Sequence, residues 1–278
     1  MPPAIDGATK VLGLLGHHIS YSLSPTIHNF SMQLMGLNQV YVPFDCAAGA
    51  LPSLVKTLWD IGSPGFNVTQ PHKFALASLL GWAGNRSINT AFRGDKGFLG
   101  KSTDGAGFQA ALRHLGRDLK SFKKIVLIGG GGAASGIVEH LKGVGFGGEV
   151  LQFSRKGSVQ GEIGSHMHLL LSVQLLEEAL RSEGSDCLLV QATSGPHQGD
   201  DLAAFEPALD KYSGVVVDIC YGKVSRLILA ARAKGLVSQD GIPMLIEQAR
   251  ESQMAWWKQA APYGAIEQEL VGNKGVFS

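Results

Sequence analysis

Apolar positions recur along this chain with two different periods. Short, nearly continuous apolar runs predict buried strands at 10–15, 41–44, 65–69, 87–92, 125–128, 149–153, 187–191, 215–219 and 236–238. Apolar side chains at mixed three- and four-residue spacing predict helices from 24, at 51–59, from 70 after the cap at Thr69, at 108–115, 133–142, 165–181 and 225–234, from 243 and at 266–270. Strands that alternate with helices in this way predict an α/β fold.

The alternation falls into two series. The second series begins with Lys123 and Lys124, and its regular strand–helix units predict a doubly wound parallel sheet of Rossmann type. We therefore expect one α/β domain over 1–105, to which the helices of 243–278 return, and a second domain over 106–242.

The composition indicates a globular protein with a small-molecule partner. The 278 residues, 45% of them hydrophobic and 17% charged, suffice for two domains. Lys and Arg (24) nearly balance Asp and Glu (23), which gives no electrostatic case for nucleic acid or an anionic membrane. We see neither a signal peptide nor an apolar run of the roughly 18 residues that a membrane span needs. Cys46, Cys187 and Cys220 lack CxxC spacing, which argues against disulfides or zinc and fits a reducing cytoplasm.

The stretch from Gly65 to Lys73 is the first candidate for chemistry. We expect Val68 to end a strand, Thr69 to cap the next helix, and Pro71 to lie in its first turn. Ligands of α/β sheets bind outside the carboxyl ends of the strands, so Lys73 would face a cleft and could donate a proton there. The alternative is a solvated surface lysine.

Two further helix starts carry candidate polar groups. Ser24 followed by Pro25 is typical of an N-cap and first turn, and with Ser22 it offers donors for a carboxylate. The alternative is that both serines only cap a turn. Asp104 precedes a helix and would be a plain N-cap unless it meets Lys73 in space.

The glycine run after the strand at 125–128 indicates a dinucleotide site. Gly129-x-Gly131-x-x-Ala134 fits the fingerprint in which glycines let backbone amides approach a pyrophosphate. The next strand ends in Ser154, Arg155 and Lys156, where an NAD site would carry an acidic residue. Cations there suit a 2′-phosphate, so we expect NADP; the alternative is two basic residues on a surface loop.

Taken together, these motifs resemble one family. The chain is similar to shikimate dehydrogenases in Ser22-x-Ser24-Pro25, Asn67-Val68-Thr69-x-Pro71-x-Lys73, Asn89-Thr90, Thr103-Asp104-Gly105, the run from Gly129 to Ala133, Asp218-x-x-Tyr221 and Gly241-x-x-Met244-Leu245-x-x-Gln248. Their order and approximate spacing match the family over nearly the whole chain.

The resemblance implies a cytoplasmic, two-domain oxidoreductase of the chorismate pathway to aromatic amino acids. It would reduce 3-dehydroshikimate to shikimate with NADPH as a monomer or homodimer, with the substrate in the cleft between a substrate-binding, catalytic domain (1–105) and a dinucleotide-binding domain (106–242). Lys73 and Asp104 would be the catalytic pair. The other implied site residues are Ser22 and Ser24 at the substrate carboxylate, Asn67, Thr69, Asn89, Tyr221 and Gln248 at its ring and hydroxyls, and Gly129, Gly130, Gly131, Gly132, Ala133, Ser154, Arg155, Lys156, Thr193 and Gly241 at the cofactor.

Several positions depart from the family pattern and leave the substrate open. They are Arg86-Ser87, Ser102, Gln191, Gly222-Lys223 and a short segment between Lys73 and Asn89. One alternative is a paralogue that acts on quinate or an aminated relative of shikimate, with NAD. Another is a regulator that binds the small acid without turnover, since a fold alone does not fix a function. A folate-type dehydrogenase has little support, because the two-serine loop and Gln248 favour a small hydroxylated acid.

Overall fold

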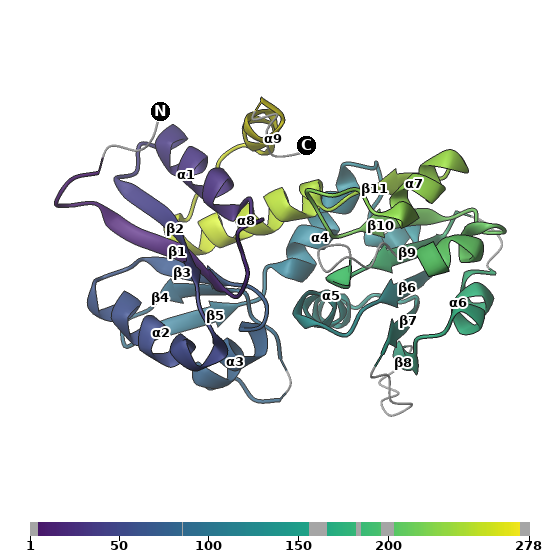
Figure 1. Ribbon diagram of the computed structural model, residues 1–278, viewed down its shortest axis with the longest axis horizontal. Coiled ribbons are helices and arrows are strands. Elements are labelled where there is room, and N and C mark those ends of the chain that lie inside the picture. Colours follow the sequence, from purple (N-terminus) through teal and green to yellow (C-terminus); the bar gives the residue numbers. More distant parts are fainter. Residues whose placement is uncertain (1–4, 85, 156–165, 182–184, 196–202, 273–278) are drawn as a thin grey trace. The chain divides into compact units, whose positions relative to one another are not determined.

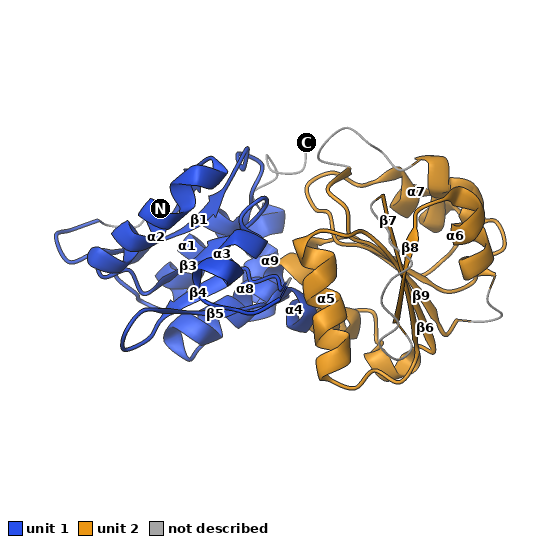
Figure 2. Cartoon of the chain, turned by 90° about the horizontal axis from the view of Figure 1, so that it is seen from below, with its two compact units in different colours: residues 1–107, 246–278 blue, residues 108–245 orange. Residues whose placement is uncertain are grey.

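The chain forms two compact units. A computed structural model describes residues 5–84, 86–155, 166–181, 185–195 and 203–272. Unit 1 comprises residues 1–107 and 246–278, and unit 2 comprises residues 108–245 (Figure 2). Among the described residues, no helix combines the length and the apolar character needed to cross a membrane.

Unit 1 is built on a mixed sheet with the strand order β2-β1-β3-β4-β5 (Figure 1). The strands are β1 (Lys10–Gly16), β2 (Gln39–Asp45), β3 (Gly65–Val68), β4 (Thr90–Arg93) and β5 (Phe98–Lys101). The first three run parallel, whereas β4 runs antiparallel to β3 and forms an antiparallel hairpin with β5. The helices are α1 (Ser24–Leu34), α2 (Leu51–Asp60), α3 (Lys73–Leu79), the start of α4 (Asp104–Arg113), most of α8 (Ile242–Trp257), and α9 (Tyr263–Gly272), with a 3₁₀ turn at Ala48–Ala50.

Alternation along β1 gives unit 1 a hydrophobic core on each face of its sheet. Leu15 packs with Leu51 and Leu58 of α2 and Leu76 of α3. Leu12 and Leu14 pack on the other face with Met32 of α1, and Trp256 and Trp257 of α8 join them. The tryptophan pair is therefore packing, as the helical pattern indicates. The segment 243–278 lies with unit 1 from Ile246 onward.

Unit 2 contains the predicted doubly wound sheet. Its six strands run parallel in the order β11-β10-β9-β6-β7-β8. They are β6 (Lys124–Ile128), β7 (Glu149–Ser154), β8 (His166–Leu170), β9 (Cys187–Gln191), β10 (Val215–Asp218) and β11 (Ser238–Gln239), with α5 (Gly132–Gly143), α6 (Val173–Leu180), α7 (Arg226–Ala233) and 3₁₀ turns at Leu119–Ser121 and Ala203–Leu209. Ile125 and Leu127 enter one core and Val126 and Ile128 the other, so β6 is buried on both faces.

The helix expected over 165–181 is wrong in its first part. Residues His166–Leu170 form strand β8, which pairs along its whole length with β7, and only Val173–Leu180 are helical. Ser172 caps that helix by accepting a hydrogen bond from the amide of Leu175 at 3.2 Å. The apolar run from Leu169 to Leu171 fits a strand as well as a helix. Backbone hydrogen bonding to the edge of β7 stabilises the strand.

Two expected helix caps also differ from the structure. Helix α3 begins at Lys73 with His72 as its N-cap, so Thr69 and Pro71 precede it. Helix α1 begins at Ser24 after the N-cap Leu23, and no side chain caps it. Instead, Ser22 Oγ accepts a hydrogen bond from the Ser24 amide at 3.3 Å. In neither place does the expected serine or threonine side chain cap the helix.

His28 is a buried titratable group in the core of unit 1. It lies inside α1, with its ring 4.5 Å from that of Tyr41 and 5.0 Å from that of Trp256. Burial lowers the pKa of His28 to about 3. The unfolded chain would protonate this histidine near its ordinary pKa of about 6.5, so below that pH the unfolded state binds more protons than the folded state.

We predict that the free energy of unfolding falls as the pH decreases from about 6.5 toward 3, with His28 contributing up to about 1.4 kcal/mol per pH unit. The variant His28→Phe, which keeps an aromatic ring, should lose that part of the slope in urea titrations at pH 7, 6 and 5. The exposed His114→Gln is the control. An unchanged slope in His28→Phe would refute the assignment.

Candidate active site

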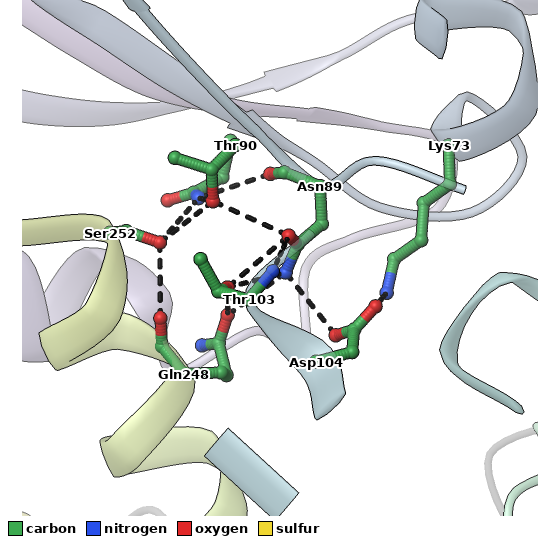
Figure 3. A network of polar contacts seen from close by, with 8 residues as sticks. Lys73, Asn89, Thr90, Thr103, Asp104, Gln248 and Ser252 are labelled. Atoms are coloured by element: carbon green, nitrogen blue, oxygen red, sulfur yellow. Dashed lines mark hydrogen bonds and ion pairs between the residues drawn. The ribbon is translucent and has the colours of Figure 1, made fainter. Parts of the chain in front are cut away.

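An ion pair between two helix starts lies at the centre of the site. Lys73 is the first residue of α3 and Asp104 is the first residue of α4. Lys73 Nζ lies 2.6 Å from Asp104 Oδ2, and the two side chains are 15% and 6% exposed (Figure 3). Asp104 therefore meets Lys73 in space, as its functional interpretation requires.

Asn89 holds the carboxylate of this pair in place. Its Nδ2 donates to Asp104 Oδ1 at 3.2 Å and to Thr103 Oγ1 at 2.9 Å, while its Oδ1 accepts from the Thr103 amide at 2.8 Å (Figure 3). Asn89 is itself buried just before β4. One amide thus fixes the strand-to-helix turn in which Asp104 begins α4, and leaves the second oxygen of Asp104 to the lysine.

Helix α8 closes the network from a distant part of the chain. Gln248 Oε1 lies 3.3 Å from Asn89 Nδ2 and 3.4 Å from Thr103 Oγ1. One turn later, the hydroxyl of the fully buried Ser252 lies 2.8 Å from Thr90 Oγ1 (Figure 3). Sequence reasoning missed Ser252, because a serine that also bonds the carbonyl four residues before it gives no signal within a helix.

Asn67 of β3 is buried and makes its hydrogen bonds inside the protein. Its Nδ2 lies within hydrogen-bond distance of Ser252 Oγ, Thr90 Oγ1 and the Asn89 carbonyl, at 2.9 to 3.1 Å, and its Oδ1 accepts from Tyr41 OH at 2.8 Å. Both amide hydrogens therefore have internal acceptors. The geometry gives Asn67 a positioning role for β3 and β4.

The loops that follow β1 and β3 lie side by side at one edge of the sheet. These strands are parallel neighbours, with Leu15 beside Val68, and the His17 amide donates to the Gln70 carbonyl at 3.1 Å. Ser22 follows β1 and Thr69 follows β3; both are half-buried, while Ser24 is buried. Ser22 and Thr69 therefore lie in the loops that follow two neighbouring strands and lead into α1 and α3, and Ser24 begins α1.

In unit 2 the glycine run between β6 and α5 leaves its backbone uncovered. Gly129 has a φ of 143°, and a Cβ there would lie 2.6 Å from the Ala192 carbonyl oxygen. Gly131 is the N-cap of α5 and Gly132 its first residue, so no side chain caps these amides. Uncapped amides at a helix N-terminus bind anions, and the loop therefore suits a pyrophosphate.

The remaining cofactor candidates surround this loop or follow nearby strands. Ala133 lies in the first turn of α5, Ser154 ends β7, and the exposed Arg155 follows it. Thr193 follows β9, the neighbour of β6, and Gly241 lies against the carbonyl of Cys220 after β10, where a Cβ would come within 2.5 Å. Lys156 lies outside the described residues.

Gln191 stabilises the turn that carries Thr193. Its Oε1 accepts from the Thr193 amide, and its Nε2 donates to the Thr193 carbonyl at 3.3 Å. Cys220 Sγ donates to that carbonyl at 3.1 Å. Beside them, burial raises the pKa of Asp218 to about 6. Gln191, which departs from the family pattern, thus makes hydrogen bonds that hold the backbone of Thr193.

Two other predicted positions have different surroundings. Tyr221 belongs to unit 2 and is half-buried. Arg86 is exposed, and its guanidinium lies 5.6 Å from the centre of the Trp82 ring. Within the described part of the chain, no three His, Cys, Asp or Glu side chains are grouped so that they could bind a metal ion.

The fold and the ion pair define a class: α/β proteins that join a mixed-sheet unit to a Rossmann-type unit. The family model "Shikimate dehydrogenase substrate binding domain" matches residues 14–87. The NADP(+) shikimate dehydrogenase of Rubrobacter xylanophilus is 36% identical over 98% of this chain and 99% of its own, and that of Thermosynechococcus vestitus is 32% identical over 94% of each. The chain belongs to the shikimate dehydrogenase family.

Solved structures of similar proteins cover both units. A shikimate 5-dehydrogenase from Thermus thermophilus, in complex with NADP(H) and shikimate, has a TM-score of 0.79 and 27% identity over 95% of this chain and 99% of that one. A shikimate dehydrogenase from Aquifex aeolicus has a TM-score of 0.81 and 26% identity over 96% of this chain and 99% of that one.

We predict that Ser252→Ala lowers the free energy of unfolding by about 1–3 kcal/mol, because it removes the buried hydrogen bonds of the Ser252 hydroxyl with Asn67 and Thr90. Ser53→Ala, which removes an exposed hydroxyl bonded to a backbone carbonyl, should change it by less than about 0.5 kcal/mol. Urea denaturation of both variants measures the difference. Equal losses would show that the Ser252 contacts do not stabilise the site.

Proposed function

We propose that this protein is an NADP-dependent shikimate dehydrogenase, which reversibly reduces 3-dehydroshikimate to shikimate. The observation that carries the proposal is the Lys73–Asp104 ion pair, 2.6 Å long and fixed by Asn89, beside the loops that bear Ser22 and Thr69. The names of the family members similar to this chain support the same reaction. Unit 1 would bind the substrate and unit 2 the dinucleotide.

The chain's own residues supply the proton of the reduction. Bound NADPH would supply a hydride to the carbonyl carbon, and the C=O π electrons would move onto oxygen. The ammonium of Lys73 stabilises this developing charge and gives the oxygen a proton, which leaves a neutral amine for reprotonation by solvent. Asp104 orients the ammonium, because its other oxygen is held by Asn89. The reverse reaction uses the amine as a base.

The substrate contacts follow from the polar groups near the pair. The hydroxyls of Ser22 and Ser24 would bind the carboxylate at the start of α1, where backbone amides also favour an anion. Thr69, Gln248 and Tyr221 would bind ring hydroxyls, and Asn89, whose amide hydrogens are bonded inside the protein, would hold this part of the site in shape. Asn67, whose amide hydrogens are already used, would keep these groups in place.

The dinucleotide contacts follow from the glycine run of unit 2. Amides from Gly129 to Gly132, with Ala133 behind them in α5, would bind the pyrophosphate. Ser154, Arg155 and Lys156 would bind the 2′-phosphate, and Thr193 and Gly241 would also contact the cofactor. A cation at the end of β7 favours NADP over NAD. We further propose a cytoplasmic location and a monomeric or homodimeric state.

Initial rates at the nicotinamide absorbance band test the proposal directly. Shikimate and quinate are each combined with NADP⁺ and NAD⁺. We expect fast turnover with shikimate and NADP⁺, and much slower turnover in the other three pairs. Turnover with quinate or NAD⁺ alone would replace the proposed substrate or cofactor. No turnover in any pair, with the protein folded, would contradict the proposed activity.

We predict that Lys73→Ala lowers kcat at least about a hundredfold and changes substrate affinity much less, since a general acid acts mainly in the transition state. Lys56→Ala is the matched control, because Lys56 also pairs with an aspartate, Asp60, but is 76% exposed. Steady-state kinetics and shikimate titration measure both quantities. Near-normal turnover in Lys73→Ala would rule out the assigned role.

A further inference from the structure

A ladder of four polar side chains crosses the edge of the unit 2 sheet. Gln152 and Ser154 are two positions apart on β7, and His166 and His168 are two positions apart on the edge strand β8. His166 Nε2 lies 3.1 Å from Gln152 Oε1, and His168 Nε2 lies 2.8 Å from Ser154 Oγ. All four are on one face, because the alternating Leu151 and Phe153 lie in the apolar core of the other face.

This polar ladder ends at the glycine loop. Gln152 Nε2 donates to the Gly129 carbonyl at 2.8 Å. A Cβ on Gly130 would lie 3.0 Å from Ser154 Cβ, so the loop passes directly over the last residue of β7. In a Rossmann-type unit the end of this second strand is where the adenine ribose of a dinucleotide is recognised. The ladder therefore links both histidines to the groups that would meet the cofactor.

We propose that His168 determines the preference for NADP by positioning the Ser154 hydroxyl for the 2′-phosphate and by taking up a proton when that phosphate binds. The inference rests on the proposed function, whose cofactor it concerns. It concerns a residue thirteen positions after Arg155 along the chain, brought to the same site only by the pairing of β8 with β7. NAD⁺, which lacks the phosphate, would gain nothing from it.

The groups around His168 favour a neutral ring in the free protein and a protonated ring when the phosphate is bound. Burial lowers the pKa of His168, so the free protein keeps it neutral near pH 7. The other charged groups near the ladder are His166, its neighbour on β8, and Lys142 of α5. Burial together with the Lys142 charge lowers the pKa of His166 to about 4. A phosphate dianion beside Ser154 would reverse this balance for His168, since an opposite charge within about 4–6 Å favours the protonated form.

The hydrogen bond between His168 and Ser154 sets the direction of the Ser154 hydroxyl. When His168 Nε2 carries the proton, it donates to Ser154 Oγ, and the serine hydrogen is directed to another acceptor. Protonation of the ring fixes this direction, because imidazolium has only donors. A phosphate oxygen would then receive a hydrogen bond from Ser154 that His168 strengthens, alongside the charge of Arg155.

Calorimetric titration of the full-length protein with NADP⁺ and NAD⁺ tests the inference, at pH 6.5 and 8 and in two buffers of different protonation enthalpy. Wild type should take up more protons with NADP⁺ than with NAD⁺. His168→Gln, whose amide can still bond Ser154 but cannot become charged, should lose that extra uptake and bind NADP⁺ about tenfold more weakly, with NAD⁺ affinity within about twofold. The phosphate has its own pKa of about 6, so the comparison is made between variants at one pH.

Two further variants complete the test. Ser154→Ala should lose NADP⁺ affinity selectively, and it keeps the inference testable if His168→Gln does not fold. His114→Gln, an exposed histidine of the same unit, should bind both dinucleotides as wild type does. Unchanged NADP⁺ affinity and proton uptake in His168→Gln would overturn the inference and leave the proposed function intact. Wild type that binds neither dinucleotide would overturn both.

Discussion

The buried negative charge of Asp104 is the constraint on which the site depends. A carboxylate that is 6% exposed must be compensated by hydrogen bonds and an opposite charge, and here Asn89 and Lys73 each take one oxygen. Because Asn89 also holds the backbone of Thr103, one compensated charge fixes the starts of α3 and α4 relative to β4. The geometry of the ion pair is therefore a property of the fold of unit 1 and not of two mobile side chains.

Each unit uses buried amides to position a loop. In unit 1, Asn67 and Asn89 connect β3 and β4 to α8 through Ser252 and Gln248. In unit 2, Gln152 supports the carbonyl of Gly129, and Gln191 supports the turn at Thr193. Buried amides that satisfy all their hydrogen bonds rigidify their surroundings. The groups proposed to bind ligands are thus held by side chains that face the interior, which is how a site becomes preorganised before a ligand arrives.

The sequence predicts the continuous apolar strands well, because β1, β6 and β9 are buried on both faces and read as unbroken runs. It fails at β8, where an edge strand of mixed polarity has no clear period, and at the start of α3, where the turn after β3 delays the helix to Lys73. Motifs in the sequence identify Lys73 and Asp104 as candidates. The contacts of Asn89 with Asp104 and of Ser252 with Asn67 are long-range, and no local pattern encodes them.

A double-mutant cycle on the ion pair tests the central claim, that Lys73 and Asp104 act as one unit in which the carboxylate serves the ammonium. Turnover of shikimate with NADP⁺ would be measured for Lys73→Ala, Asp104→Ala and the double variant. We expect a double variant about as slow as Lys73→Ala alone, since Asp104 has no separate role once the lysine is gone. Losses that multiply would contradict it, because they would mean that the two residues contribute independently.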